Sequence, residues 1–317
     1  MKKTGIIGGG FAGTMTAVHL IEKCTGPFEL VVVNEPGTLN KGVAYNPYSQ
    51  KQLLNVIASK MSAYPEKPDH FVDWISMRAE FAGLEHGLVA NAFLPRYLYG
   101  EYLTEIWGEA LKTAQSKQVQ IRMIEDTVVD LEVSNSGILM VLSGGDRIMT
   151  DDCILATGNL IPGNPKIKNS SFFESPHYFQ NPWEKLAVSN VRNLKSIMLA
   201  GNGLTMVDTV IGLLENGFHG TIYSVSPNGY NILPHRHNGL TYSKLREEFP
   251  ATASLSQIVR LVHKHIKSVR KLGISAEPVI DSIRPLTQQI WRTMTDAEKQ
   301  LFISRLRHLW GVARHRI

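Results

Sequence analysis

The stretch GIIGGGFAG at residues 5–13 decides the fold of the N-terminal region. An apolar strand leads into it, and a helical pattern follows it. The spacing G-x-G-x-x-G falls on Gly8, Gly10 and Gly13. Gly8 permits a tight turn out of the strand, Gly10 lets backbone amides approach a pyrophosphate, and Gly13 lets the helix pack close to the sheet. The stretch therefore predicts a βαβ unit that binds a dinucleotide.

Two further features support this prediction. The first turn of the expected helix, at Phe11, Ala12 and Gly13, has backbone N–H groups without partners inside the helix, and they carry a partial positive charge. The next apolar strand, LVVV at residues 30–33, is followed by Glu35. A carboxylate at this place accepts hydrogen bonds from a ribose diol, and its charge disfavours a 2′-phosphate.

Length and composition fit a globular protein with two domains. The chain has 317 residues, of which 43% are hydrophobic and 19% charged. No apolar stretch approaches the length of a membrane span. Cys24 and Cys153 fall in a predicted helix and a predicted strand, so we expect thiols in a reducing compartment rather than a disulfide. These features favour a cytoplasmic protein without membrane contact.

The net charge of +5 is unevenly distributed. Residues 230–317 hold 15 Lys and Arg and 6 Asp and Glu, a net charge of +9, so the preceding residues carry −4. Such a basic segment can attract nucleic acid such as RNA, or it can form the solvated face of helices and attract anionic cofactors. We favour the second interpretation, because no recognised nucleic-acid-binding module accompanies the charge.

The order of patterns predicts an α/β chain with three regions. Residues 40–116 interrupt the first unit with loops and two helices, the second of which begins after Pro95. Short strands at 119–124, 127–133, 138–143 and 147–149 predict an antiparallel β-meander, which leads into an apolar strand ending in Ala156-Thr157-Gly158. Residues 1–165 then form one dinucleotide-binding domain with an insertion at 40–116, residues 166–241 a second, and residues 242–317 a basic helical segment.

A second glycine turn supports the second domain. Its strand covers 197–200, and its turn is Gly201-Asn202-Gly203. A helix from about 204 to 216 and a strand over 221–225 follow. Backbone groups of Gly201, Gly203, Leu204 and Thr205 can hold the pyrophosphate of a nicotinamide dinucleotide, NADPH or NADH.

This second turn departs from the pattern at two places. Met206 occupies the third glycine position and prevents the closest approach of helix and strand. The second strand is followed by Ser226 and Pro227, so neither an acid for a ribose diol nor an arginine for a 2′-phosphate stands there. Cofactor binding and a nucleotide fold that no longer binds both remain open.

The sequence resembles a bacterial FAD/NAD(P)-binding protein family related to the flavin-dependent N-hydroxylating and other class B monooxygenases. The resemblance covers nearly the whole chain, and it rests on the two glycine turns and on the stretches KGVAY at 41–45, LLNV at 53–56, Met61-Ser62, FLPRYLYGEY at 93–102, ATGN at 156–159 and GNGLTMVD at 201–208. It implies two Rossmann-like domains of the glutathione-reductase type, with FAD in the first and Thr157 and Gly158 beside it. Taken alone, the Ala-Thr-Gly stretch is equally a small turn after a buried strand.

The same resemblance suggests three residues near the flavin. Arg96, at the predicted start of a helix, faces FAD, or it is a surface arginine. Asn55 and Met61 lie near the isoalloxazine ring, or they cap a loop and fill the core, respectively. No catalytic residue is assigned beyond these candidates, since in flavin chemistry the cofactor carries the reaction.

The resemblance also implies a return of the chain to the FAD domain on a strand that often ends in Gly-Asp. The sequence reaches Ile317 without such a strand, so we expect this return to be missing. The His235-x-His237 pair and the Arg314-His315-Arg316 run lack acidic or cysteine partners at ligand spacing, and we expect no metal.

Together these features predict an FAD-dependent oxidoreductase that NADPH reduces. We expect a monooxygenase-like reaction on a small molecule such as an amine, with molecular oxygen as co-substrate. The alternatives are an NAD(P)H-dependent reductase without oxygen insertion and a flavin-binding protein without turnover on a truncated scaffold. The sequence does not indicate the oligomeric state.

Overall fold

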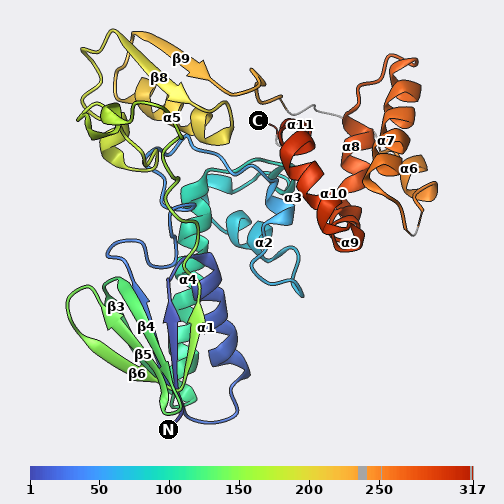
Figure 1. Cartoon of the computed structure of the whole chain (residues 1–317). Coiled ribbons are helices and arrows are strands. Elements are labelled where there is room, and N and C mark those ends of the chain that lie inside the picture. Colours follow the sequence, from blue (N-terminus) through green and yellow to red (C-terminus); the bar gives the residue numbers. More distant parts are fainter. Residues whose placement is uncertain (235–240, 251, 315, 317) are drawn as a thin grey trace. The chain divides into compact units, whose positions relative to one another are not determined.

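A computed structural model covers the chain and describes residues 1–234, 241–250, 252–314 and 316. The chain divides into two compact units (Figure 1). The first contains residues 1–191 and 211–217, and the second contains residues 192–210 and 218–317. Among the described residues, no helix is both long and apolar enough to cross a membrane.

The first unit is built on a parallel sheet of four strands in the order β3-β2-β1-β7. The strands are β1 Lys3–Ile7, β2 Glu29–Asn34, β3 Gln120–Glu125 and β7 Asp152–Leu155. Helices α1 Phe11–Lys23 and α4 Arg96–Ser116 lie side by side along one face of this sheet (Figure 1). A three-stranded antiparallel sheet, β4 Val128–Ser134, β5 Gly137–Leu142 and β6 Arg147–Thr150, covers the other face.

Alternation along β1 and β2 explains why these strands are continuously apolar. Ile6 and Val32 point into the helical core around α1 and α4, whereas Ile7 and Val33 point into a second core with Met140 of β5. A parallel sheet covered on both faces needs apolar residues at every position. The run of four apolar residues in β2 therefore reflects two separate cores.

The predicted meander is wrong in one strand. Residues 120–125 pair in parallel with β2, with Leu30 opposite Ile121, and so belong to the nucleotide-binding sheet. The meander contains only β4, β5 and β6. The physical reason is the crossover through α4, which brings the chain back parallel to β2. Asp126 then accepts hydrogen bonds from Thr127 N and Gly144 N at the turn where the chain leaves this sheet.

The insertion between β2 and β3 contains the two predicted helical regions. Helix α2 His70–Ser76 buries Phe71 and Ile75, and the short helix α3 His86–Ala90 follows it. Helix α4 begins after Pro95 as predicted, and it buries Leu103 and Trp107 against α1.

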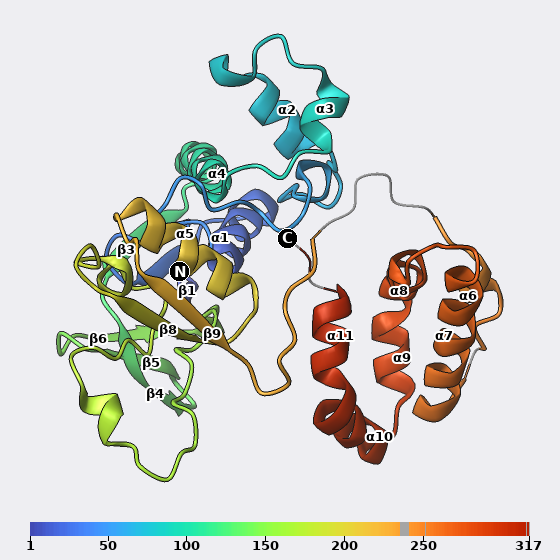
Figure 2. The same ribbon diagram turned by 90° about the horizontal axis from the view of Figure 1, so that it is seen from above.

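The second unit contains a parallel pair of strands and a group of helices. Strands β8 Ser196–Ala200 and β9 Thr221–Val225 are joined through helix α5 Leu204–Glu215, of which residues 204–210 belong to this unit, and this confirms the predicted β-α-β order. The basic C-terminal segment is helical, as predicted, and forms its own core (Figure 2). Its helices are α6 Lys244–Glu247, α7 Leu255–Arg270, α8 Glu277–Ile283, α9 Thr287–Thr293, α10 Asp296–Leu301 and α11 Arg307–Arg314.

Both cysteines carry free thiols and are half-buried. Cys24 lies directly after α1, where its Sγ donates to Ile21 O at 3.1 Å. Cys153 lies in β7, and burial raises the pKa of its thiol.

Candidate functional site

The turn between β1 and α1 is shaped by two glycines that have no space for a side chain. Gly8 has φ +97°, and a Cβ there would lie 2.3 Å from Ala156 O. A Cβ on Gly13 would lie 1.8 Å from Gly8 O. Both contacts are far below any distance that real Cβ atoms show, so Gly8 and Gly13 are required by the packing of the protein itself. The Ala-Thr-Gly stretch thus lies directly beside the first glycine turn.

Gly9 is fixed by hydrogen bonds with the side chains of Asn34 and Thr14 and with the backbone N–H of Asn40. Its N–H donates to Asn34 Oδ1 at 2.7 Å, at the end of β2. Its carbonyl accepts from Asn40 N at 2.6 Å and from Thr14 Oγ1 at 3.1 Å. Asn40 is buried and has φ +66°, a conformation that asparagine tolerates better than most residues. These bonds satisfy Gly9 and hold the turn in one conformation.

Gly10 differs from its neighbours because its surroundings leave room. It is the N-cap of α1, with φ −72° and ψ −164°, and no side chain caps the helix there. The nearest atom to a Cβ on Gly10 would be Gly42 Cα at 3.5 Å, an ordinary contact. The first helical N–H that bonds back into the turn is that of Thr14, to Gly10 O at 2.9 Å. Phe11 and Ala12 are exposed, and their N–H groups lie in the first turn of α1, at the positive end of the helix dipole.

The stretch 41–45 closes the turn against α4. Gly42 has φ +52° and lies against Gly10. A Cβ on Gly100 of α4 would lie 2.4 Å from Tyr45 O, so this stretch contacts the helix backbone directly. The Tyr45 ring packs on Tyr99, with centroids 4.5 Å apart, and burial raises the pKa of the Tyr45 phenol.

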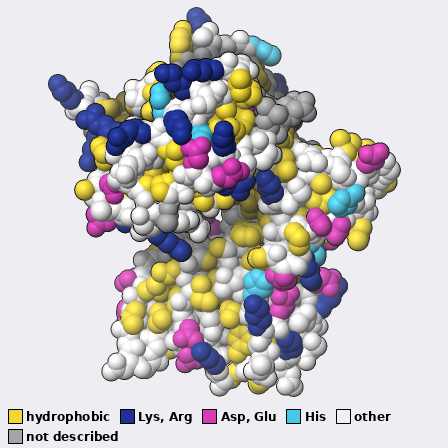
Figure 3. Space-filling view, turned by 90° about the vertical axis from the view of Figure 1, so that its right-hand side faces the viewer, with side chains coloured by type: hydrophobic (Ala, Val, Ile, Leu, Met, Phe, Trp, Pro, Cys, Tyr) yellow, Lys and Arg dark blue, Asp and Glu magenta, His cyan; other side chains and the backbone are white. Residues whose placement is uncertain are grey.

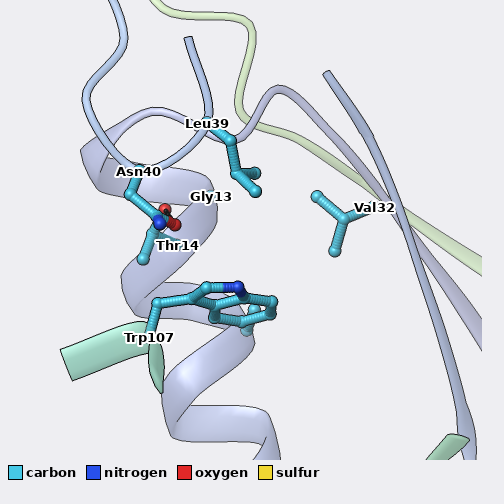
Figure 4. A pocket seen from close by; sticks show the side chains of 7 residues that line it. Gly13, Thr14, Val32, Leu39, Asn40 and Trp107 are labelled. Carbon is cyan, nitrogen blue, oxygen red and sulfur yellow. Dashed lines mark hydrogen bonds between the residues drawn. The ribbon is translucent and has the colours of Figure 1, made fainter. Parts of the chain in front are cut away.

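Behind the turn lies a narrow crevice that is lined by α1, β2, the loop around Asn40 and Trp107 (Figure 4). It contains no space wide enough for a water molecule. Figure 4 shows Thr14 and Asn40 pointing toward each other, and Thr14 Oγ1 donates to Asn40 Oδ1 at 3.2 Å. The crevice is therefore part of the support of the turn and has no room for a ligand.

Three other predicted contacts lie at the same edge of the sheet. Glu35 directly follows β2 and is exposed. Thr157 and Gly158 follow β7, the strand on the other side of β1, and both are exposed; Gly158 has φ +68°. Carboxyl ends of neighbouring parallel strands are the usual place for a ligand in such sheets. The structure therefore brings these residues to the same edge as Gly10.

The three candidates near the flavin have different surroundings. Arg96 begins α4, where its Nε donates to Leu53 O at 2.9 Å and its N–H to Gln52 O at 2.9 Å. Asn55 is exposed in the loop that Arg96 supports. Met61 is partly buried against the helical core. Their roles toward a flavin stay predictions.

The second glycine turn is held by polar side chains. Gly201 has φ +121°, and its N–H donates to Val225 O at 2.7 Å. Asn202 donates to Asn231 Oδ1 at 2.8 Å and accepts from Ser224 Oγ. A Cβ on either Gly201 or Gly203 would meet no described atom within 4 Å. Leu204 and Thr205 begin α5 and are partly exposed, and their role in binding a dinucleotide stays a prediction.

No metal site is found among the residues that the structure describes, because no three His, Cys, Asp or Glu side chains are grouped for one. His235, His237 and His315 lie outside the described residues.

The comparisons with known proteins agree with this geometry. Residues 5–160 match the sequence model of the FAD-NAD(P)-binding family. This region, which contains the first glycine turn and the Ala-Thr-Gly stretch, is therefore an FAD/NAD(P)-binding domain. No curated protein matches the chain.

One of the solved structures similar to this chain shares the fold of most of it. An ornithine N-hydroxylase from Kutzneria sp. 744, solved with reduced FAD, NADP⁺ and L-ornithine, is 12% identical, with 94% of this chain and 66% of that chain covered and a TM-score of 0.52. A flavin monooxygenase mutant from Stenotrophomonas maltophilia is 14% identical, with 78% and 63% covered and a TM-score of 0.47. A cyclohexanone monooxygenase is 14% identical, with 74% and 40% covered and a TM-score of 0.44. The chain spans less than two thirds of the length of these proteins.

Sequence reasoning did not identify the residues that fix the turn. Asn34, Asn40 and Thr14 carry no motif of their own. An asparagine at the end of a strand is a residue type whose side chain bonds backbone groups, as Asn34 does. Asn40 bonds Gly9 through its backbone N–H, which is independent of its side chain. Their role depends on Gly9, which lies 25 and 31 positions before the two asparagines in the sequence.

Proposed function

We propose that this chain is part of an FAD-dependent oxidoreductase that NADPH reduces, and that it acts as a monooxygenase on a small soft nucleophile such as an amine. The observation that carries the proposal is the contrast within the first turn, where Gly8 and Gly13 are required by packing and Gly10 is not. When bound, FAD accepts a hydride and activates oxygen.

The residues of the first turn fit the phosphates of FAD. The N–H groups of Phe11, Ala12 and Gly13 form a fixed anion site, and Gly10 leaves the space that a side chain would fill. Glu35 accepts hydrogen bonds from the adenosine ribose. Thr157 and Gly158, exposed beside the turn, are the proposed contacts of the flavin half.

The second turn fits a second dinucleotide more loosely. Gly201 and Gly203 leave open space at the start of α5, which suits a pyrophosphate. The residues after β9 are Ser226 and Pro227, neither of which is acidic, so no carboxylate there would repel a 2′-phosphate. This supports NADPH over NADH as the reductant.

The choice of an amine and of oxygen insertion rests on likeness. The ornithine N-hydroxylase structure matches this chain with a TM-score of 0.52. A reductase without oxygen insertion uses the same two turns, and the two reactions differ in whether product or peroxide accumulates.

A flavin-binding protein without turnover is the second candidate. It is favoured by Met206, which stands where the first turn has Gly13, and by the absence of a cationic side chain directly after β9. In this case FAD binds to the first turn and NADPH does not reduce it.

One experiment separates these proposals. The purified chain is reconstituted with FAD, its visible spectrum is recorded, and NADPH and NADH are titrated without oxygen. We expect a flavin spectrum that NADPH bleaches faster than NADH. A flavin spectrum that neither nucleotide bleaches supports the second candidate, and a colourless protein contradicts both. Aerobic turnover with amine substrates, with hydroxylated product measured against peroxide, then distinguishes the monooxygenase from the reductase.

A further inference from the structure

Helix α7 of the second unit carries a row of basic side chains on its outer face. Figure 3 views the C-terminal helices from outside and shows Lys and Arg side chains gathered there. Positions 260, 264, 267 and 271 follow the spacing i, i+4, i+7, i+11, which places them on one line of a helix. We call Arg260, Lys264 and Lys267 of α7, together with Lys271 at its C-cap, the basic row of α7.

The basic row is exposed and straight. All four residues are exposed, and the exposed Arg270 extends the positive surface at its side. The row covers about 16 Å along the helix axis. Its opposite face, with Leu255, Ile258 and Val269, is buried in the core of the helical group. A full capping box at Ser254 and Gln257 fixes the start of the helix. The row is therefore presented on a rigid support.

The acids of the helical segment do not neutralise the row. Six carboxylates lie in the described residues 242–250, 252–314 and 316, and five of them have partners outside the row. The sixth, Glu248, pairs with Lys264 at 2.7 Å and also faces the buried His265. The other pairings are Glu247 with Ser243, Glu277 with Arg316, Asp281 with Arg284 and Arg316, Asp296 with Lys299, and Glu298 with the backbone of Thr295 and Leu255. Arg260 bonds only to Ser256 within α7. Three of the four charges thus have no carboxylate partner among the residues that the structure describes.

The surroundings of the row favour a protein over a lipid surface or a nucleic acid strand. Among the described residues 252–272, the exposed large apolar side chains are Val259 in α7 and Leu272 directly after it, too few to insert into a bilayer. The helix contains no Phe, Tyr or Trp on which bases could stack. Another α-helix has the same rise and period, so carboxylates at i, i+4, i+7 and i+11 match the row in register along its whole length.

We propose that the basic row of α7 docks an acidic α-helix of a partner protein. The proposal does not depend on the reaction of the flavin domain. Complementary charge sets the orientation of such a complex and speeds its formation. Because salt screens this attraction, weaker binding at higher salt measures its contribution.

The test uses the full chain and two labelled peptides of equal composition. One is an alanine-based helix with Glu at i, i+4, i+7 and i+11, and the other has the same four Glu distributed around the helix. Binding is followed by fluorescence anisotropy at low and moderate salt, with a 20-base-pair RNA duplex and phosphatidylserine vesicles as competing probes. We expect the first peptide to bind more tightly than the second peptide and both other probes.

Charge variants locate the surface. Arg260→Glu with Lys267→Glu is expected to weaken binding of the first peptide roughly tenfold. Arg305→Glu with Arg307→Glu makes the same charge change on and beside α11, which lies on the other side of α8 and α9 (Figure 2), and is expected to have a smaller effect. The milder Arg260→Gln with Lys267→Gln checks the result if the first variant folds poorly. Equal binding of the two peptides, tighter binding of the duplex or vesicles, or equal loss in both charge variants would overturn the proposal.

Discussion

The two glycine turns share a sequence pattern but are built differently. In the first, Gly8 and Gly13 are locked by backbone contacts, because a Cβ on either would come within 2.3 Å of a carbonyl oxygen. In the second, a Cβ on Gly201 or Gly203 would meet no described atom within 4 Å, and Met206 replaces the third glycine. Side-chain bonds from Asn202 to Ser224 and Asn231 hold the second turn instead. The glycines Gly8 and Gly13 of the first turn are therefore needed for packing. Packing does not require Gly201 and Gly203 of the second turn, so a ligand is the remaining reason for them.

The largest expected effect is on the stability of the first unit. Gly13→Ala places a methyl group 1.8 Å from Gly8 O, so α1 must shift away from the sheet. We expect a loss of about 3 kcal/mol or more in the free energy of unfolding, measured by urea denaturation. Gly108→Ala, also in a helix but facing open space, is the control and should not destabilise. Equal stability of the two variants would break the comparison.

Gly10→Ala tests the ligand role of the first turn. Its Cβ fits the protein, since the nearest atom is 3.5 Å away, but it occupies the space proposed for the pyrophosphate. We expect an unchanged melting temperature without cofactor and an FAD Kd raised roughly hundredfold, since blocking the anion site costs about 2–3 kcal/mol. The Kd is measured by flavin fluorescence, with Gly108→Ala as the control. A wild-type Kd would show that FAD lies elsewhere.

Gly203→Ala makes the matching change in the second turn. Here the added methyl group lies at an exposed position with open space around it, so a bound cofactor can shift to accommodate it. We expect a smaller effect. The apparent Kd for NADPH, taken from the rate of flavin reduction against NADPH concentration, should rise roughly tenfold, and FAD binding should be unchanged. Stopped-flow bleaching measures it. An effect on FAD binding of the same size would contradict separate roles for the two turns.

Glu35→Gln has the smallest expected effect. The carboxylate is exposed after β2, so its hydrogen bonds to a ribose are screened by water. We expect FAD binding to weaken roughly threefold with no change in stability. Titration with FAD and with adenosine diphosphate alone should show the same ratio, because both ligands contain this ribose. A loss seen with FAD only would place Glu35 near the flavin half.

The sequence predicted the helices and strands around the turns well, but it did not predict the strand pairing and the hydrogen bonds that hold the turns. The start of α4 after Pro95 and the order β8, α5, β9 follow from local patterns, and the structure confirms them. The assignment of residues 119–124 to the meander was wrong, because an isolated apolar strand does not reveal its partner. The hydrogen bonds of Asn34 and Asn40 with Gly9 were also missed, because they join residues that are far apart in the sequence.

The sequence by itself determined where the two helix N-termini lie, that the C-terminal segment is basic and helical, and that the first turn belongs to a dinucleotide fold. Each of these depends on residues close together in the chain. Only the tertiary structure decided that β3 joins the parallel sheet, that Gly8 and Gly13 are needed for packing, and that Gly10 has free space. These depend on contacts such as Gly8 with Ala156, which join residues far apart in the sequence, and no local pattern records which distant backbone will approach a given glycine.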